Sequence, residues 1–263
     1  GGGQDGFGGW QEGAAAQPPE AQVSLERGRR AWLVHCAPCH GREGGGNGPA
    51  ARFLEPPPRD LTRGEYKWRS TASGALPTDA DILRTIDEGA PGSAMPSWRT
   101  RLPESTRHSL VAWVKTFSPR FHSEDPLADP PVEVPPMPAE ATRLSDGGTQ
   151  LLDAGKATWK RLKCWDCHGD GGRGDGPSTT GMKDSQGRRI APNDLVKGVF
   201  RAGDSAEAVY RTLMTGLNGT PMPSYQPTTT PAERWPLVLY VRSLRRPRTW
   251  IDTLFAPLQE QTR

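Results

Sequence analysis

Cys36-Ala37-Pro38-Cys39-His40 and Cys164-Trp165-Asp166-Cys167-His168 are the two stretches that decide the fold, and they contain all four cysteines of the 263-residue chain. Two thiols three positions apart lie on one helical turn. There they can add to the two vinyl groups along one edge of a porphyrin, with the following histidine under the iron. Each stretch therefore predicts a covalent haem. The predicted attachment residues are Cys36, Cys39, Cys164 and Cys167, and the predicted proximal iron ligands are His40 and His168.

A redox dithiol or half of a zinc site would be the ordinary alternatives for an isolated Cys-x-x-Cys pair. A zinc site would require both pairs to meet at one metal, and it would not need a histidine directly after each pair. It would also leave the rest of the internal similarity unexplained. Haem attachment is therefore favoured over both alternatives.

The similarity between the two halves extends well beyond these motifs. Cys164 follows Cys36 by 128 positions, and the glycine-rich stretches 41–49 and 169–177 correspond at the same offset. Further along, Gly92-Ser93-Ala94-Met95-Pro96-Ser97-Trp98 corresponds to Gly219-Thr220-Pro221-Met222-Pro223-Ser224-Tyr225 at an offset of 127. A period this long indicates two whole domains rather than an array of small repeats.

A methionine occupies the same place in a Gly/Pro-rich loop of each half. Met95 follows His40 by 55 positions, and Met222 follows His168 by 54. Methionine can serve as an axial haem ligand, and a rigid Met-Pro loop suits positioning better than core packing. Met95 and Met222 are therefore predicted to complete two His/Met-ligated irons. The other candidates, Met137, Met182 and Met214, are expected to fill apolar space.

With these motifs the chain resembles the class I c-type cytochromes, in the tandem dihaem form of the cytochrome c4 group, over about residues 28–117 and 155–244. The resemblance implies an all-α fold of two tandem cytochrome c class I domains, each enclosing one covalent haem c. The stretches between haem motif and methionine, such as residues 56–61, are longer than a minimal domain of this family needs.

Local signals place helices before the two methionine loops. Thr78-Asp79-Ala80-Asp81 and Asp204-Ser205-Ala206-Glu207 resemble capping boxes, which open helices. Gly89 and Gly216 are the expected stops.

The last helix of each domain carries one apolar face. In the resembled family this helix crosses the first one, which implies a contact of Trp32 with Trp113 and of Trp159 with Tyr240. Pro236 removes a backbone donor from the second copy, so a kink or a later helix start is expected there.

Composition divides the chain into five parts. The predicted parts are a flexible N-terminal arm (1–22), cytochrome c domain 1 (23–120), a Pro-rich linker (121–148), cytochrome c domain 2 (149–246) and a C-terminal tail (247–263). The linker is expected to be extended and stiff, and it either fixes the domain orientation or only crosses the surface. Only 34% of the residues are hydrophobic. The apo-protein is therefore predicted to be largely unfolded.

The resemblance also implies a compartment, because haem is attached outside the cytoplasmic membrane in this family. A bacterial periplasm is expected, with the signal peptide already removed from a chain that begins at Gly1. No apolar run approaches the roughly 18 residues that span a bilayer, so no membrane span is expected. A formal net charge of only +3, with no matching motif, gives no support to nucleic acid binding.

Arg69 and Arg201 stand in similar Trp68-Arg69 and Phe200-Arg201 contexts between haem motif and methionine. Each is a candidate cofactor-binding residue that pairs a haem propionate. A surface role is the equal alternative for both.

Two six-coordinate haems leave no open site for a substrate, so one-electron transfer is favoured and no catalytic residue is predicted. The expected donor is a periplasmic dehydrogenase or a quinol-oxidising complex, and the expected acceptor is an oxidase or a reductase. Two alternatives stay open. One is a dihaem peroxidase-like enzyme with one open haem, and the other is a permanent haem subunit of a larger dehydrogenase or reductase complex.

Overall fold

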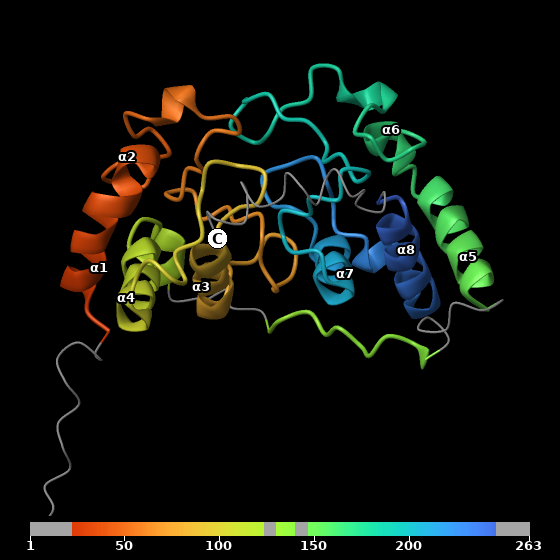
Figure 1. Ribbon diagram of the computed structural model, residues 1–263, viewed down its shortest axis with the longest axis horizontal. Coiled ribbons are helices and arrows are strands. Elements are labelled where there is room, and N and C mark those ends of the chain that lie inside the picture. Colours follow the sequence, from red (N-terminus) through yellow and green to blue (C-terminus); the bar gives the residue numbers. More distant parts are fainter. Residues whose placement is uncertain (1–22, 124–129, 140–146, 246–263) are drawn as a thin grey trace, which may run out of the picture.

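The computed structural model describes residues 23–123, 130–139 and 147–245, so the predicted arm and tail lie outside the described residues. The α-helices of the first half are α1 (Leu25–Ala31), α2 (Ala37–His40), α3 (Asp79–Glu88) and α4 (Glu104–Lys115), and those of the second half are α5 (Gly147–Arg161), α6 (Trp165–His168), α7 (Ala206–Thr215) and α8 (Pro231–Ser243). Among the described residues the β structure is limited to an isolated bridge between Lys183 and Arg189. Figure 1 shows the two helical halves side by side, with loops gathered between them.

In each half the first and last long helices cross at a glycine. A Cβ atom on Gly28 of α1 would collide with the Ser109 carbonyl of α4, and one on Gly155 of α5 would collide with the Pro236 carbonyl of α8. Only glycine permits backbones to approach so closely. The two glycines stand 127 positions apart, so the internal repeat extends to helix packing.

The aromatic contacts at these crossings differ between the halves. Trp159 lies edge-on to Tyr240 with ring centroids 5.8 Å apart, which confirms the expected pair. The ring of Trp32 instead packs on Phe117, at 4.7 Å, and Trp113 contacts the other edge of Phe117 at 5.9 Å. Phe117 is one turn further along than Trp113, so it fills the space between the two tryptophans.

Helix α8 does not start late. It begins at Pro231, with Thr230 as N-cap in a capping box with Glu233, and runs through Pro236. Of the two alternatives expected from the sequence, the later start is wrong, because the capping box fixes the first turn ahead of the proline. The kink at Pro236 stays a prediction. The bond that Pro236 cannot donate is lost inside the helix.

The helices before the methionine loops follow the expected caps. Thr78 and Asp81 form the predicted capping box of α3. Helix α7 begins at Ala206 with Ser205 as N-cap, at the offset of 127 from α3 and one residue later than the predicted Asp204–Glu207 pattern. Gly89 and Gly216 end the two helices at φ of 71° and 66°, as predicted.

Each haem motif follows the first helix through a strained junction. In the first half, residues Trp32–Cys36 form a π-helical turn that leads into α2. The second half has one more residue before its motif, and Lys163 there takes a left-handed φ of 55°. The extra residue is thus absorbed in a turn between α5 and α6, which leaves the motif helix itself intact.

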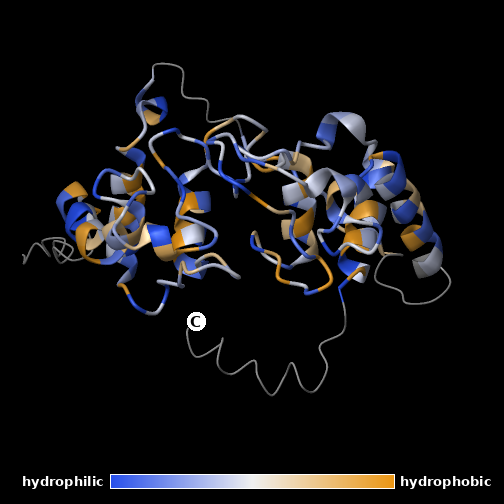
Figure 2. Cartoon of the chain, turned by 90° about the horizontal axis from the view of Figure 1, so that it is seen from above, coloured by the Kyte–Doolittle hydropathy of each residue, from blue (hydrophilic) through white to orange (hydrophobic). Residues whose placement is uncertain are grey.

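The described part of the linker contacts both halves. Val132 donates its backbone N–H to the Ser70 carbonyl at 2.7 Å. Val132, Val134 and Met137 also pack against the apolar core of the second half, around Trp235 and Leu237. Figure 2 shows apolar and polar residues mixed along the helices of both lobes. No helix among the described residues is long and apolar enough to cross a membrane.

Candidate haem sites

One continuous cavity of about 850 Å³ runs through both halves of the protein. All ten residues that the haem prediction depends on can be placed relative to it. Its wall includes the attachment cysteines Cys36, Cys39, Cys164 and Cys167, the histidines His40 and His168, the methionines Met95 and Met222, and Arg201. Only Arg69 is not part of that wall. The structure therefore brings together, in each half, the cysteines, histidine and methionine that the sequence selected.

The two histidines are held in the same way. Nδ1 of His168 lies 3.2 Å from the Asn193 carbonyl, and Nδ1 of His40 lies 3.5 Å from the Arg59 carbonyl. An Nδ1–H group that donates to a carbonyl leaves Nε2 as the free nitrogen for a metal. Burial lowers the pKa of both imidazoles. Each histidine is thus kept in the neutral form that binds iron.

The sequence analysis did not identify the residues that hold the histidines, although a shared sequence pattern marks them. Pro58-Arg59-Asp60-Leu61 and Pro192-Asn193-Asp194-Leu195 share a Pro-x-Asp-Leu pattern. In both halves the leucine N–H donates to a glycine carbonyl of the haem-motif loop, Leu61 to Gly44 and Leu195 to Gly172. These segments lie 134 positions apart, outside the offsets of 127 and 128 that reveal the rest of the repeat.

The two methionine loops also share one hydrogen-bond frame. Ala90 N–H donates to the Met95 carbonyl, and Leu217 N–H donates to the Met222 carbonyl. A serine after each methionine, Ser97 or Ser224, donates its hydroxyl to a carbonyl in the last turn of the preceding helix at 2.5 Å. Both methionines are therefore carried on loops that are closed and anchored at their base.

Each methionine loop packs against the other domain. The place a Cβ would take on Gly92 is 3.2 Å from Cγ1 of Val199, in the second half. The equivalent place on Gly219 is 3.0 Å from Nη1 of Arg59 and from Oε2 of Glu65, in the first half. The domain interface is thus built around the two methionine loops.

A cluster of cations lines the cavity where the halves meet. Arg59, Lys67, Arg188 and Arg201 contribute to it, together with the carboxylate of Asp184. Nη1 of Arg59 and Nε of Arg201 are buried with no hydrogen-bond partner in the protein, whereas Nε of Arg188 lies 3.4 Å from Oδ2 of Asp184. Burial, followed by the charge of Arg59, lowers the pKa of Lys67 to about 8. A buried surplus of positive charge with unpaired donors fits the propionates of a haem, which are carboxylates.

Arg201 and Arg69 have different surroundings. Arg201 belongs to this cluster, so the propionate role stays a prediction for it. Arg69 is only 2% exposed, which excludes the surface alternative, and its guanidinium donates to backbone carbonyls. Arg69 therefore forms a structural contact between the two domains and does not lie on the cavity wall.

The zinc alternative finds no support in the geometry. No group of three or more His, Cys, Asp or Glu side chains that could hold a metal ion occurs in the described parts of the chain. The two cysteine pairs belong to separate halves, each beside its own histidine.

Comparison with known proteins agrees with this arrangement. The family model described as cytochrome c oxidase, cbb3-type, subunit III matches residues 23–114 and again residues 150–241. A chain from a Kuenenia stuttgartiensis structure, the reducing HAO-like protein complex, is 44% identical and superposes with a TM-score of 0.78; the match covers 87% of this chain and 99% of that one. The cbb3-type cytochrome c oxidase subunit FixP of Azorhizobium caulinodans is 22% identical over 86% of this chain. The chain spans 62% of the length of FixP.

Proposed function

The chain belongs to the family of the cbb3-type cytochrome c oxidase subunit III, and it is a dihaem class I c-type cytochrome with two covalent haem c groups. From this premise we propose that it carries single electrons between redox proteins of the periplasm through two His/Met-ligated irons. Haem c supplies the one-electron chemistry when bound. The protein supplies the axial ligands, the apolar cavity wall and the charged side chains around the haems.

The observation that carries the proposal is the pairing of one histidine and one methionine on the cavity wall in each half. His40 and Met95 lie in the first half, and His168 and Met222 in the second. An iron with both axial positions filled exchanges electrons without binding a substrate. Because both sites open into one cavity, the two haems would lie close enough to exchange electrons with each other.

The surrounding residues support a carrier in three ways. Apolar side chains such as Ile82, Leu110 and Val241 line the cavity and exclude water. The carbonyls of Arg59 and Asn193 orient the two imidazoles. The cations between the domains would balance the negative charge of the haem propionates where the two halves meet.

The partners follow from the same premise. FixP is by name a subunit of a cbb3-type cytochrome c oxidase. We propose an oxidase or a reductase as the acceptor of this chain, and a periplasmic dehydrogenase or a quinol-oxidising complex as its donor. The periplasm is the proposed location because covalent haem attachment takes place outside the cytoplasmic membrane in this family.

A permanent subunit of a larger redox complex is the second candidate. The relative that matches at 44% identity, with almost all of its chain covered, is part of a protein complex. Native mass spectrometry of the untagged protein from its source separates the two candidates. A free carrier gives the mass of one chain plus two haems, whereas a subunit stays with its partner on dilution.

The test of the electron-transfer function is an optical titration of the holoprotein. The oxidised form should show the methionine-to-iron charge-transfer band, and the reduced form should show no spectral change with carbon monoxide. Prompt binding of carbon monoxide would mean an open iron. The carrier proposal would then be given up for a dihaem peroxidase-like enzyme.

A further inference from the structure

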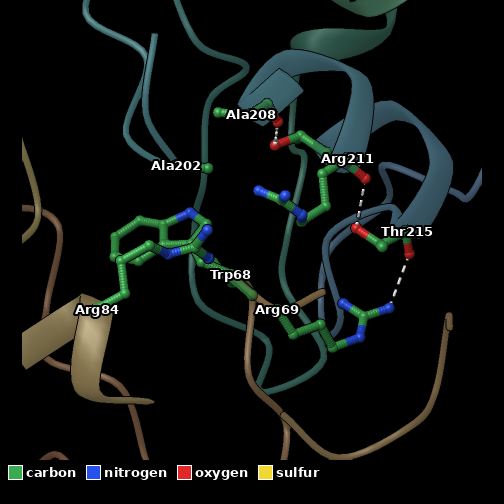
Figure 3. A pocket seen from close by; sticks show the side chains of 9 residues that line it. Trp68, Arg69, Arg84, Ala202, Ala208, Arg211 and Thr215 are labelled. Carbon is green, nitrogen blue, oxygen red and sulfur yellow. Dashed lines mark hydrogen bonds between the residues drawn. The ribbon is translucent and has the colours of Figure 1, made fainter. Parts of the chain in front are cut away.

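Arg69 ties the first domain to the end of a helix in the second. Its Nη2 donates to the Thr215 carbonyl at 2.7 Å, and its Nη1 lies 3.4 Å from the Gly216 carbonyl. Within its own domain, Nε donates to the Ala72 carbonyl at 3.1 Å and Nη1 also reaches the Tyr66 carbonyl. Figure 3 shows the guanidinium pointing at Thr215, beside the small interdomain cavity that Arg84 and Arg211 also line.

The Thr215 carbonyl that Arg69 binds lies at the C-terminal end of α7, where a helix leaves its carbonyls without hydrogen-bond donors. The last four carbonyls of an α-helix have no intrahelical donor. In α7 the Thr212 carbonyl accepts from Gly216 N–H, the Leu213 carbonyl from Tyr225 N–H, and the Met214 carbonyl from the Ser224 hydroxyl. The fourth, on Thr215, accepts from Arg69.

Three of these four bonds come from residues that flank the methionine loop. Two come from Ser224 and Tyr225, directly after Met222 and Pro223, and one comes from Gly216, directly before the loop. The loop is closed by Leu217 N–H, which donates to the Met222 carbonyl at 3.1 Å. Arg69 is thus the one member of this set that belongs to the other domain.

A second contact across the boundary reaches the same loop. Asn218 accepts from Gly74 N–H at 3.0 Å and donates to the Ala75 carbonyl at 3.3 Å. Both partners lie a few residues after Arg69 in domain 1. At the first methionine loop the neighbour from the other domain is different, since Val199 and Arg201 lie against Gly92. The support that Arg69 gives is therefore specific to the Met222 loop.

We infer that Arg69 is a positioning residue for the methionine ligand of the second haem. From domain 1 it holds the junction of α7 with the Met222 loop, and through that junction it keeps Met222 at the iron. The inference rests on the proposed His/Met ligation. Its consequence is that the redox properties of the haem in domain 2 depend on docking to domain 1.

The experiment compares three holoproteins that carry two haems each: wild type, Arg69→Gln and Arg161→Gln. Arg161 is the control, because its guanidinium also donates to a backbone carbonyl, that of Thr228, but within its own domain and outside the Met222 loop. Imidazole is titrated into the ferric proteins, where it competes with methionine for the iron. A redox titration then gives the two potentials.

In Arg69→Gln, imidazole should bind one of the two haems about tenfold more tightly than in wild type, as expected for the loss of a charged hydrogen bond. The charge-transfer band should fall to one half at that first step, and one of the two potentials should drop. Arg161→Gln should behave like wild type. In a Met222→Leu background Arg69→Gln should have no further effect, whereas in a Met95→Leu background its effect should persist.

Unchanged imidazole affinity and potentials in Arg69→Gln would overturn the inference, and so would equal weakening of both haems, which a general loosening of the interface produces. If Arg69→Gln does not assemble, Arg69→Lys takes its place in the same comparison, since lysine keeps the charge but cannot reach both sets of carbonyls. A wild type that lacks the charge-transfer band and binds carbon monoxide would instead contradict the proposed function, whatever the variants do.

Discussion

At the scale of single residues, the two halves present the same side chains with different support. His40 and His168 each face a backbone carbonyl, of Arg59 and of Asn193. These carbonyls belong to residues of different type, so the bond depends on the fold of the Pro-x-Asp-Leu segment and not on the side chain. Substitution of Asn193 should therefore leave the orientation of the histidine largely intact.

The methionine ligands can be tested one at a time. Met222→Leu should remove half of the charge-transfer absorbance and let the reduced protein bind one carbon monoxide per chain, because leucine has a similar volume but offers no sulfur to iron. Met95→Leu should give the same result at the other haem. Met182→Leu is the matched control, since Met182 also lines the cavity but stands outside the repeated Met-Pro loop. Carbon monoxide binding to the Met182 variant would contradict the assignment.

The basic cluster should set the haem potentials. Arg201→Gln removes a buried positive charge from the cavity wall, which makes the ferric haem easier to form. A charge at this depth contributes on the order of 1–2 kcal/mol, or about 50–90 mV for one electron. The potential of at least one haem should fall by about that amount in a redox titration. Arg52→Gln, at an exposed arginine that lies over Phe53, is the control and should leave both potentials unchanged.

At the scale of helices, most of the architecture could be predicted because the same sequence signals occur in both halves of the chain. The haem motifs, the capping signals of α3 and α7 and the glycines after them recur at a nearly constant offset. What could not be predicted is local packing that differs between copies. Trp32 meets Phe117 where Trp159 meets Tyr240, since the space at each crossing depends on side chains from several segments at once.

The glycine crossings should tolerate no larger residue. Gly28→Ala and Gly155→Ala each place a methyl group against a backbone carbonyl of the facing helix, and backbone cannot move aside as a side chain can. Overpacking of this kind costs typically about 1–3 kcal/mol. Each variant should unfold at a lower denaturant concentration than wild type, as followed by circular dichroism of the holoprotein. Gly171→Ala, whose Cβ would meet only Arg173 at 3.9 Å, should match wild type.

At the scale of the whole molecule, the sequence predicts two domains but not how they dock. The interface combines the two repeated methionine loops with segments that do not follow the repeat, such as those around Arg59 and Arg188. The periodicity of the sequence carries no information on these segments. Arg69 illustrates the limit. Its Trp-Arg context resembles that of Arg201, yet one guanidinium caps a helix of the other domain while the other lines the cavity. Pairing between distant backbone carbonyls and a side chain leaves no local sequence signal.

The size of the cavity determines what the protein can do without haem. A dry void costs about 24 cal/mol per Å³, so a cavity of about 850 Å³ corresponds to an upper limit of about 20 kcal/mol. Water entering the cavity would reduce that cost, but it would also wet the apolar wall around Leu110 and Val241. Typical stabilities are only about 5–15 kcal/mol. The chain made without haem attachment, with all four motif cysteines replaced by alanine, should therefore not keep this fold.

The measurement is near-ultraviolet circular dichroism together with limited proteolysis of the haem-free chain. Loss of the tryptophan signals and rapid cleavage within residues 23–123 and 147–245 are expected. Replacement of only Cys164 and Cys167 gives a sharper comparison, because the second domain should then be cleaved while the first, with its haem, loses only its contacts with the second domain. A haem-free chain with native near-ultraviolet signals would mean that the helix crossings alone keep each domain folded.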